Sequence, residues 1–330
     1  MFNQNYRFIA FFCFLFLSIA TIFLLKTTKE PSLLPLIGDT FGKATNQENP
    51  SFPRNYRSVQ ESYKNLPANL PKEGLENLPV VGTSQFTKAQ LKEILDHIGK
   101  EKKVFVIDLR EETHLVFEDR DGNQIPITAF APKNLGNSGK SSVEIKADRL
   151  FYKNYILGKK EITLHKAKGG NVFINENDPV FLVGNVYTEE EIVEDLNKNQ
   201  HYNVSYLLIP VTDHKSPSPQ KLDDYIAFLQ KVDDEPNTVL LFHCLAGRGR
   251  TGLFIVLTDI IENAKKYHLS LEDILARHAA AGSPDFTKAK EGHTQNSQER
   301  IDLIRRVYEY AIADDGLNAG VSYSKWNDSH

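Results

Sequence analysis

The 330-residue sequence predicts an α/β fold, in which helices flank a central sheet and a small β-rich part is inserted. Apolar runs of strand length alternate with segments of helical periodicity, and the strand-length runs are residues 104–107, 206–211 and 238–242. Between residue 115 and about residue 185 the pattern changes to short strand-like runs. The first observation indicates a sheet with helical connections, and the second indicates a β-rich insertion.

Composition limits the classes of function. The net charge of −4 argues against general nucleic-acid binding, so a cationic site has to be local. The two cysteines are Cys13, which lies in an N-terminal apolar run, and Cys244. The rest of the chain therefore has a single thiol and cannot form an internal disulfide.

The N-terminal residues 8–25 form a stretch of 18 residues without a charge. As a helix it would span about 27 Å, slightly less than the roughly 30 Å core of a bilayer. Ser18-Ile19-Ala20 offers a small-x-small cleavage site, so the stretch is either a signal peptide or an uncleaved membrane anchor. We therefore expect an exported or membrane-anchored protein. The expected parts are a targeting or anchoring segment at 1–25, a linker at 26–53 and one domain at 54–330 with the insertion at about 115–185.

Capping and apolar runs predict the first helix and strand of the domain. Thr87 caps a helix with apolar residues on one face. The strand at 104–107 ends in the polar segment 108–114. Polar residues at the carboxyl end of a buried strand are where an open α/β sheet places its site. Asp108 either contacts a substrate there or pairs with its neighbours to hold the walls of the site.

The insertion is predicted from turn signals and short apolar runs. Asp121-Gly122-Asn123 separates two such runs and indicates a hairpin. Further short strands are expected at 142–145, 161–164 and 180–183. Lysines are frequent here and form either a solvated face or a surface toward an anionic ligand: Lys153, Lys159, Lys160, Lys166 and Lys168.

A possible proton donor follows the strand at 206–211. Thr188 opens the preceding helix with a capping box, and the strand ends in Asp213, His214 and Lys215. A loop aspartate at this place can protonate a leaving alkoxide, and His214 can position that aspartate or touch substrate. The alternative is that Asp213 is a turn or capping residue.

The residues from His243 to Gly252 carry the strongest signal. They lie between a buried strand and a long helix, where free backbone N–H groups and the helix dipole bind anions. Gly247 and Gly249 allow the backbone to form an anion nest. The same field favours the thiolate of Cys244, which makes it a nucleophile, and Arg250 can grip two phosphate oxygens. The alternative is a structural cysteine beside a glycine turn.

Several motifs in this order resemble those of the protein-tyrosine-phosphatase-like inositol polyphosphate phosphatases, the cysteine phytases, over roughly residues 54–312. They are Tyr56-Arg57-Ser58, Gly82-Thr83-Ser84-Gln85, the segment from Asp108 to His114, Thr212-Asp213-His214 with Pro217, the segment from His243 to Thr251, and Gln298-Glu299-Arg300-Ile301.

The resemblance implies a tyrosine-phosphatase-like sheet with a small partial β-barrel, a deep cationic pocket and a phosphocysteine intermediate, without a metal or other cofactor. It implies that Cys244, Arg250 and Asp213 are catalytic. The partner is then a small polyanionic phosphate ester, an inositol polyphosphate or a phosphoinositide, and not a nucleic acid. Together with the loop chemistry, it gives these substrate-binding residues: His243, Leu245, Ala246, Gly247, Arg248, Gly249, Thr251, His214, Lys215, Arg57 and Asp108.

Departures from the family pattern leave the substrate open. Leu245 stands where the family often has a charged residue, Gly252 where it often has a second threonine, and Ser216 where it often has an aromatic residue. Arg248 adds a charge near the position of a lysine in phosphoinositide phosphatases. A lipid phosphatase, a protein tyrosine or dual-specificity phosphatase, and a non-catalytic phosphate-binding protein are therefore the alternatives to an inositol polyphosphate phosphatase. On loop proximity, Lys288 and Lys290 are further cations for the pocket rim.

Overall fold

The computed structural model describes residues 33–38, 51–168, 171–233, 235, 237–288 and 294–330. The expected targeting or anchoring segment at 1–25, and Lys290, lie outside these residues. Within the described part of the chain, no helix combines the length and the apolar composition that a bilayer span requires.

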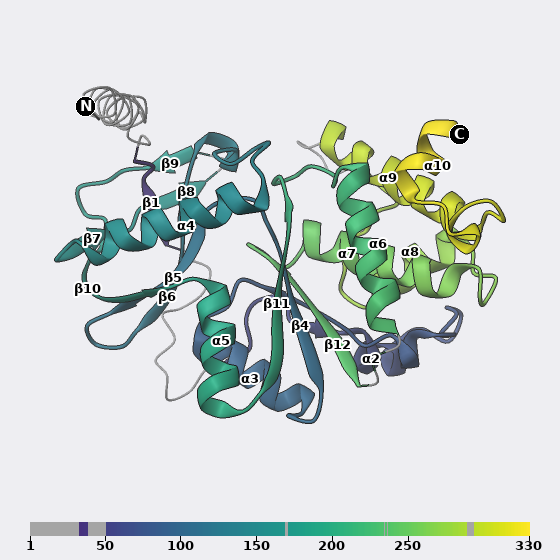
Figure 1. The fold of residues 1–330 in the computed structure, drawn as a ribbon, viewed down its shortest axis with the longest axis horizontal. Coiled ribbons are helices and arrows are strands. Elements are labelled where there is room, and N and C mark those ends of the chain that lie inside the picture. Colours follow the sequence, from purple (N-terminus) through teal and green to yellow (C-terminus); the bar gives the residue numbers. More distant parts are fainter. Residues whose placement is uncertain (1–32, 39–50, 169–170, 234, 236, 289–293) are drawn as a thin grey trace, which may run out of the picture. The chain divides into compact units, whose positions relative to one another are not determined.

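The central sheet confirms the predicted α/β fold (Figure 1). Its strands lie in the order β11, β4, β12, β3 and β2, where β4, β12 and β11 are the three strand-length runs expected from the sequence. The first four strands are parallel, and the short β2 is antiparallel to β3. Their bounds are β2 Arg57–Ser58, β3 Val80–Ser84, β4 Lys103–Arg110, β11 Asn203–Val211 and β12 Thr238–Cys244.

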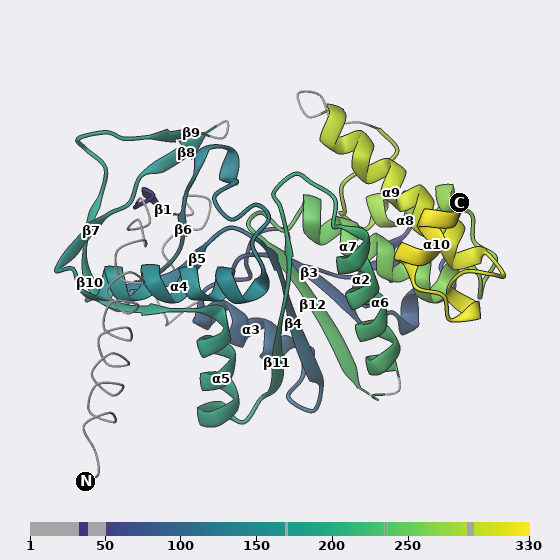
Figure 2. The same ribbon diagram turned by 45° about the horizontal axis from the view of Figure 1, so that its top comes forward.

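Helices cover both faces of this sheet (Figure 2). Helices α3 (Lys88–Ile98) and α5 (Glu189–Gln200) pack on one face, and both begin with the expected capping boxes, at Thr87 and Thr188. Helices α6 (Pro219–Asp233) and α7 (Gly249–Asp259) pack on the other face. Helices α8 (Leu271–Ala280) and α9 (Thr294–Ile312) pack against α7, and α10 (Tyr323–Ser329) packs against α6 and α9. Shorter pieces are α2 Val59–Ser62, the 3₁₀ turns Tyr63–Asn65, Leu75–Asn77, Pro132–Asn134 and Leu317–Ala319, and the π-helical turn Ile260–Ala264.

The insertion contains an antiparallel sheet with the strand order β1, β6, β5, β10 and β7. The expected hairpin joins β5 to β6, and Gly122 takes the left-handed backbone conformation of its turn with φ of 83°. Strand β1 comes from the predicted linker, so the assignment of residues 36–38 to a linker was wrong: they pair with β6. The strands are β1 Leu36–Gly38, β5 His114–Asp119, β6 Gln124–Ala129, β7 Glu161–Thr163 and β10 Val180–Tyr187, with a separate pair β8 Lys166–Lys168 and β9 Asn171–Phe173.

The expected strand at 142–145 was wrong, because these residues begin helix α4 (Ser142–Leu157). Ser141 and Glu144 form a capping box at its start. The buried face of α4 carries Ile145 and Ile156, while exposed apolar residues such as Leu150 lie on its outer face. Apolar side chains on both faces weaken the 3.6-residue periodicity by which a helix is recognised in a sequence.

Alternation along β12 sends adjacent residues to opposite faces of the sheet. Phe242 and Cys244 lie with the core that contains α7. Leu241 lies with the core that contains α3 and α5, and His243 points to that same face, where its ring lies 4.9 Å from the ring of Phe86. Cys244 and His243 are therefore on different sides of the sheet although they are neighbours in sequence.

Two adjacent residues of α4 test its orientation. Ile156 is fully buried and Leu157 is 40% exposed. We expect Ile156→Ala to lower the free energy of unfolding by about 2–5 kcal/mol, because it leaves a cavity in the core. Leu157→Ala should cost less than about 1 kcal/mol. Urea denaturation of the two variants measures the difference, and equal losses would contradict the helix as described.

Candidate active site

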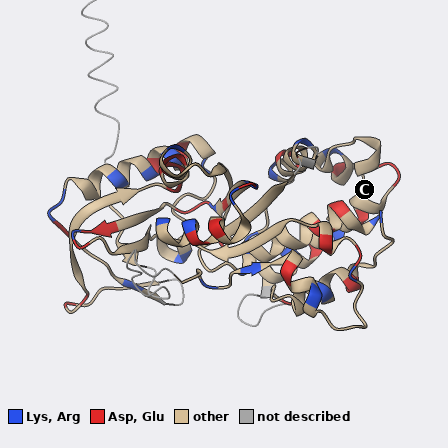
Figure 3. Cartoon of the chain, turned by 90° about the horizontal axis from the view of Figure 1, so that it is seen from below, with Lys and Arg blue, Asp and Glu red and all other residues tan. Residues whose placement is uncertain are grey.

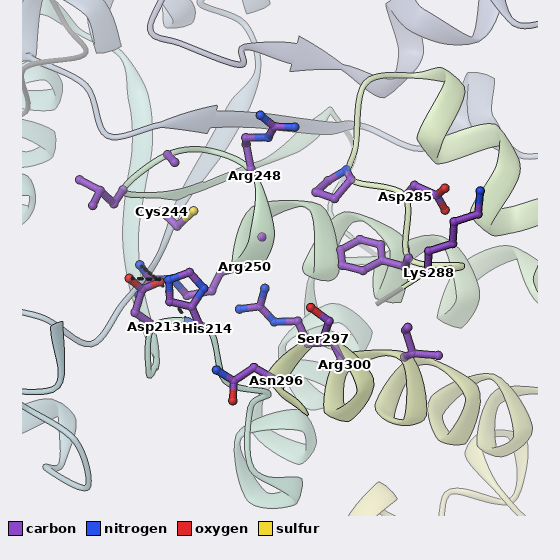
Figure 4. A pocket seen from close by; sticks show the side chains of 16 residues that line it. Asp213, His214, Cys244, Arg248, Arg250, Asp285, Lys288, Asn296, Ser297 and Arg300 are labelled. Carbon is purple, nitrogen blue, oxygen red and sulfur yellow. Dashed lines mark hydrogen bonds and ion pairs between the residues drawn. The ribbon is translucent and has the colours of Figure 1, made fainter. Parts of the chain in front are cut away.

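The loop between β12 and α7 forms the floor of a cavity (Figure 4). Strand β12 ends at Cys244 and α7 begins at Gly249, as the sequence predicts. Gly247 has a positive φ of 68°, and a Cβ there would lie 2.4 Å from the backbone nitrogen of Ser84. Only glycine fits this position. No side chain caps the N-terminus of α7, which leaves its first N–H groups for an anion.

Loop carbonyls are held from outside by the segment before β3. Asn55 Nδ2 donates to the Ala246 carbonyl at 2.7 Å, and Arg57 Nη1 donates to the Gly247 carbonyl at 2.7 Å. Because the carbonyl and the N–H of a trans peptide point in opposite directions, this arrangement turns loop N–H groups toward the cavity. Arg57 was expected to bind substrate, but it does not line the cavity. Its side chain supports the loop instead.

The cavity has a volume of about 440 Å³ and is lined by residues from four parts of the chain. They are Asp213 and His214 after β11, Cys244, Leu245, Ala246, Arg248, Gly249 and Arg250 in the loop, Pro284, Asp285, Phe286 and Lys288 after α8, and Asn296, Ser297, Arg300 and Ile301 in α9. The structure thus brings together Cys244, Arg250 and Asp213, as predicted from the sequence.

Cys244 is favoured as a thiolate. Burial alone would raise the pKa of its thiol, but the charge of Arg250 and hydrogen bonding by Thr251 outweigh burial, so the pKa is lowered. Thr251, which was expected to bind substrate, is fully buried and does not line the cavity. A thiolate at this place is the reactive form of cysteine.

Arg250 is fixed by a buried carboxylate. Its Nη1 and Nη2 atoms lie 2.6 and 2.8 Å from the two carboxylate oxygens of Glu112, and Nη1 also donates to the Val211 carbonyl at 3.0 Å. Burial raises the pKa of Glu112, but Arg250 and Arg110 outweigh this effect and hold it well below its usual value. Sequence reasoning missed Glu112 as a site residue, although it lies in the quoted segment 108–114.

Asp213 lies at the cavity wall beside Arg250. Its Oδ1 atom is 3.2 Å from Arg250 Nη2 and accepts the backbone N–H of His214 at 3.0 Å. The Nδ2 atom of Asn134, from the insertion, lies 3.3 Å from Asp213 Oδ2. His214 lines the cavity with its ring nitrogen Nε2 3.8 Å from Asp213 Oδ2. The carboxylate therefore has partners on both oxygens.

Arg300 is a cavity residue that the sequence did not single out. A Cβ on Gly249 would lie 2.6 Å from Arg300 Nη1, so the absence of a side chain at Gly249 lets this guanidinium approach the start of α7. Its Nε and Nη2 atoms donate to the carbonyl of Lys215, each at 3.2 Å. Burial and the nearby Arg250 lower the pKa of Arg300. Arg300 belongs to the motif 298–301 that supports the family resemblance, but the motif does not show which of its side chains points into the cavity.

Lys215 does not line the cavity, although it was expected to bind substrate. Its Nζ atom lies 3.6 Å from Glu299, and its carbonyl anchors Arg300. Lys288 lines the cavity as expected for a rim cation, and Arg248 lines it with an exposed side chain. Gly247 is in the loop but does not line the cavity. In Figure 4, Arg248 lies above the level of Cys244 and Arg300 lies below it.

His243 and Asp108 are on the far face of the sheet, so the expectation that they bind substrate is wrong. Both are fully buried, and His243 pairs with Glu189 of α5 at 3.0 Å. Burial lowers the pKa of His243, but Glu189 and Asp108 outweigh it, and the net shift is upward. Asp108 pairs with Arg149 at 2.9 Å and accepts from the Tyr206 hydroxyl at 2.7 Å.

This buried cluster accounts for the polar residues at the end of β4. Asp108, Glu189 and His243 bring ligand atoms within 4.8 Å of one another, a set of the kind that can hold a metal ion. Asp108 already pairs with Arg149, and Asp108 and Glu189 lie 3.1 and 3.5 Å from Nε2 of His114, while Glu189 lies 3.0 Å from Nε2 of His243. We assign the cluster to the support of the sheet, which is the second of the two interpretations given for Asp108.

Positive charge is local to the cavity. In Figure 3, Lys and Arg are interspersed with Asp and Glu over most of the elements in view. The cavity, by contrast, is lined by four cations, Arg248, Arg250, Lys288 and Arg300, against two carboxylates, Asp213 and Asp285. This agrees with the sequence-based expectation of a local cationic site in a weakly acidic chain.

Comparisons with known proteins agree with this geometry. Residues 107–262 match the family model of protein-tyrosine-phosphatase-like phytases, which is described as "Inositol hexakisphosphate". The effector protein hopD2 of Pseudomonas syringae pv. tomato is 27% identical over 267 residues, which are 78% of this chain and 53% of that protein. The chain therefore spans about half the length of this curated relative.

Solved structures show the same fold. A tandemly repeated protein tyrosine phosphatase-like phytase from Mitsuokella multacida aligns with a TM-score of 0.72 and 25% identity over 91% of this chain and 50% of that chain. A phytase of the same kind from Bdellovibrio bacteriovorus aligns with a TM-score of 0.62 and 23% identity over 89% of this chain and 94% of that chain. The family match across the loop and its supporting strands, together with these solved structures, confirms the predicted resemblance to the protein-tyrosine-phosphatase-like inositol phosphatases.

Proposed function

We propose that the chain is a phosphomonoesterase that hydrolyses inositol polyphosphates through a phosphocysteine intermediate. One observation carries the proposal: a cysteine whose pKa is lowered lies in the same cationic cavity as Arg250 and Asp213. The family match supports the general class of phosphatase, and its printed description supports inositol hexakisphosphate as the type of substrate.

In the first step, Cys244 Sγ attacks phosphorus and forms the S–P bond while the bond from phosphorus to the ester oxygen breaks. Arg250 and the loop N–H groups stabilise the charge on the phosphoryl oxygens. Asp213, in its protonated form, gives its proton to the leaving alkoxide, and the alcohol departs. Electron balance is kept, because the thiolate pair enters the new bond and the ester pair leaves with the oxygen.

In the second step, water attacks the phosphocysteine. Asp213, now a carboxylate, takes a proton from this water as the new oxygen–phosphorus bond forms and the S–P bond breaks. Inorganic phosphate leaves, Cys244 returns as a thiolate and Asp213 returns protonated. The two steps use the side chains and backbone N–H groups of the cavity and water.

The cations around the loop favour a polyphosphorylated ring as substrate. A single phosphate is satisfied by the loop and Arg250, so Arg248, Lys288 and Arg300 remain for further phosphates. Hydrogen bonds to charged groups contribute roughly 1.5–3 kcal/mol each, which is enough to select a polyanion.

Export belongs to the proposal on sequence grounds. The uncharged residues 8–25 would act as a signal peptide or an anchor, and residues 54–330, with strand β1 paired to their inserted sheet, as the catalytic domain. A single thiol in that domain suits an oxidising compartment, because Cys244 has no partner there with which to mispair.

The first prediction concerns the nucleophile. Cys244→Ser should abolish phosphate release but keep ligand binding, because a serine hydroxyl is a far weaker nucleophile and the loop and Arg250 remain. In the unchanged protein, iodoacetamide should inactivate the enzyme below the ordinary thiol pKa of about 8.5, since the pKa of Cys244 is lowered. Substantial turnover by the serine variant, or a loss in chelator that a divalent ion restores, would contradict the mechanism.

The second prediction concerns the acid. Asp213→Asn should reduce kcat/KM for phytate, an alkyl phosphate, by about 10²–10⁴-fold. It should reduce kcat/KM for para-nitrophenyl phosphate far less, because this ratio reports the first step and that leaving group needs no proton. Steady-state rates on both substrates at one pH give the ratio. Equal losses would assign Asp213 a structural role.

The third prediction concerns substrate charge. The kcat/KM for phytate should exceed that for a phosphotyrosine peptide by at least about tenfold, and added salt should narrow the gap because exposed charges are screened. Arg248→Ala should lower the value for phytate more than the value for para-nitrophenyl phosphate. The kcat/KM values of the unchanged protein and of Arg248→Ala on these three substrates, measured at low and at high salt, test both statements. Equal efficiency on the peptide and phytate would favour a protein phosphatase, and a higher rate on phosphoinositide vesicles would favour a lipid phosphatase.

A further inference from the structure

The loop between β6 and α4 brings a buried amide from the insertion to the acid of the cavity. Asn134 is 6% exposed, and its Nδ2 atom lies 3.3 Å from Asp213 Oδ2. The other carboxylate oxygen, Oδ1, lies near Arg250. Asn134 thus contacts the oxygen of Asp213 that Arg250 leaves free.

The backbone of this loop is held in an unusual conformation. Lys133 and Asn134 have φ angles of 55° and 62°, so two consecutive residues that are not glycine are left-handed. Such residues cost conformational energy and persist where the surroundings impose them. Asparagine tolerates this conformation better than most residues, and the conformation carries its side chain into the protein.

The loop is also tied to the segment that fixes Arg250. Asn137 Nδ2 donates to the Glu111 carbonyl at 2.9 Å and to Thr113 Oγ1 at 2.8 Å. These residues flank Glu112, which binds Arg250. One short segment after β4 therefore supports both Arg250 and the loop that carries Asn134.

We propose that Asn134 is a positioning residue for Asp213 in both steps of the reaction. This inference rests on the proposed function, in which Asp213 alternates between carboxylic acid and carboxylate. An amide can serve both forms: its N–H donates to the carboxylate, and after rotation its oxygen accepts the proton of the acid. Asn134 Oδ1 is buried and has no hydrogen-bond partner among the described residues, so it is available for the second role.

A neutral side chain suits this position because charged groups already surround Asp213. Arg250 and His214 lie 3.2 and 3.8 Å from its oxygens, and Arg300 and Cys244 lie close enough to interact with it electrostatically. A further charge would favour one protonation state over the other. The amide instead restricts the orientation of the carboxyl group while leaving both states accessible.

The test is Asn134→Gly, which removes the amide and still accepts a positive φ. We expect kcat/KM for phytate to fall about tenfold and kcat/KM for para-nitrophenyl phosphate to change less than about twofold, since this ratio reports the first step and only the alkyl leaving group needs the acid there. In an Asp213→Asn background, Asn134→Gly should have no further effect, because it acts through Asp213. Activity on the aryl ester also shows that the variant is folded.

Lys133→Gly is the matched control. It relieves the neighbouring left-handed residue without touching the amide, and it should leave the ratio of the two kcat/KM values unchanged. If Asp213→Asn is selective for phytate but Asn134→Gly lowers both rates equally or neither, the inference is overturned and the proposed function stands. If Asp213→Asn is itself unselective, the acid role of Asp213 falls, and the role of Asn134 falls with it.

Discussion

The ion pair between Glu112 and Arg250 is the interaction on which the site depends. Both side chains are buried, and the two guanidinium nitrogens meet the two carboxylate oxygens at 2.6 and 2.8 Å. Arg250 is the second residue of α7, and Glu112 lies just after the end of β4. The carbonyl of Val211, the last residue of β11, also accepts a hydrogen bond from Arg250. A bidentate pair fixes both position and rotation of the guanidinium. It therefore aligns the carboxyl ends of two strands with the beginning of a helix.

The same pair sets the charge of the cavity. Removing charged side chains from water costs free energy. The attraction between Glu112 and Arg250, together with their further hydrogen bonds, offsets this cost. Glu112 neutralises Arg250 only in part, since Arg250 still lowers the pKa of Cys244 and pairs with Asp213. Glu112 stays paired with Arg250 throughout, whereas the thiolate of Cys244 and the carboxylate of Asp213 interact with it only in some states. When a bound phosphate takes the place of one of these two anions, Arg250 is still balanced and does not become an isolated buried charge. Substrate binding then exchanges partners around a fixed guanidinium.

Local patterns predicted part of this arrangement, and chain geometry decided the rest. The β12 loop and Asp213 were found because a strand, a turn and a helix start lie together in sequence, and because a parallel sheet gathers the carboxyl ends of its strands at one edge. His243 and Asp108 were placed on the wrong side, since their side chains alternate with those that face α7. Helix α4 was missed because apolar residues lie on both of its faces. Arg300 and Asn134 approach the site from distant segments, and no short motif reports where their side chains point.

Alternation along β12 also limits how this sequence can change in length. Cys244 and His243 belong to different sides of one sheet, and each side is filled, by α7 on one and by α3 and α5 on the other. Insertion or deletion of one residue within β12 would exchange their faces, placing the imidazole in the cavity and the thiol among buried carboxylates. No side-chain substitution elsewhere could repair that exchange. Length changes among relatives should therefore be absent between Thr238 and Gly249 and should collect in connections outside the sheets.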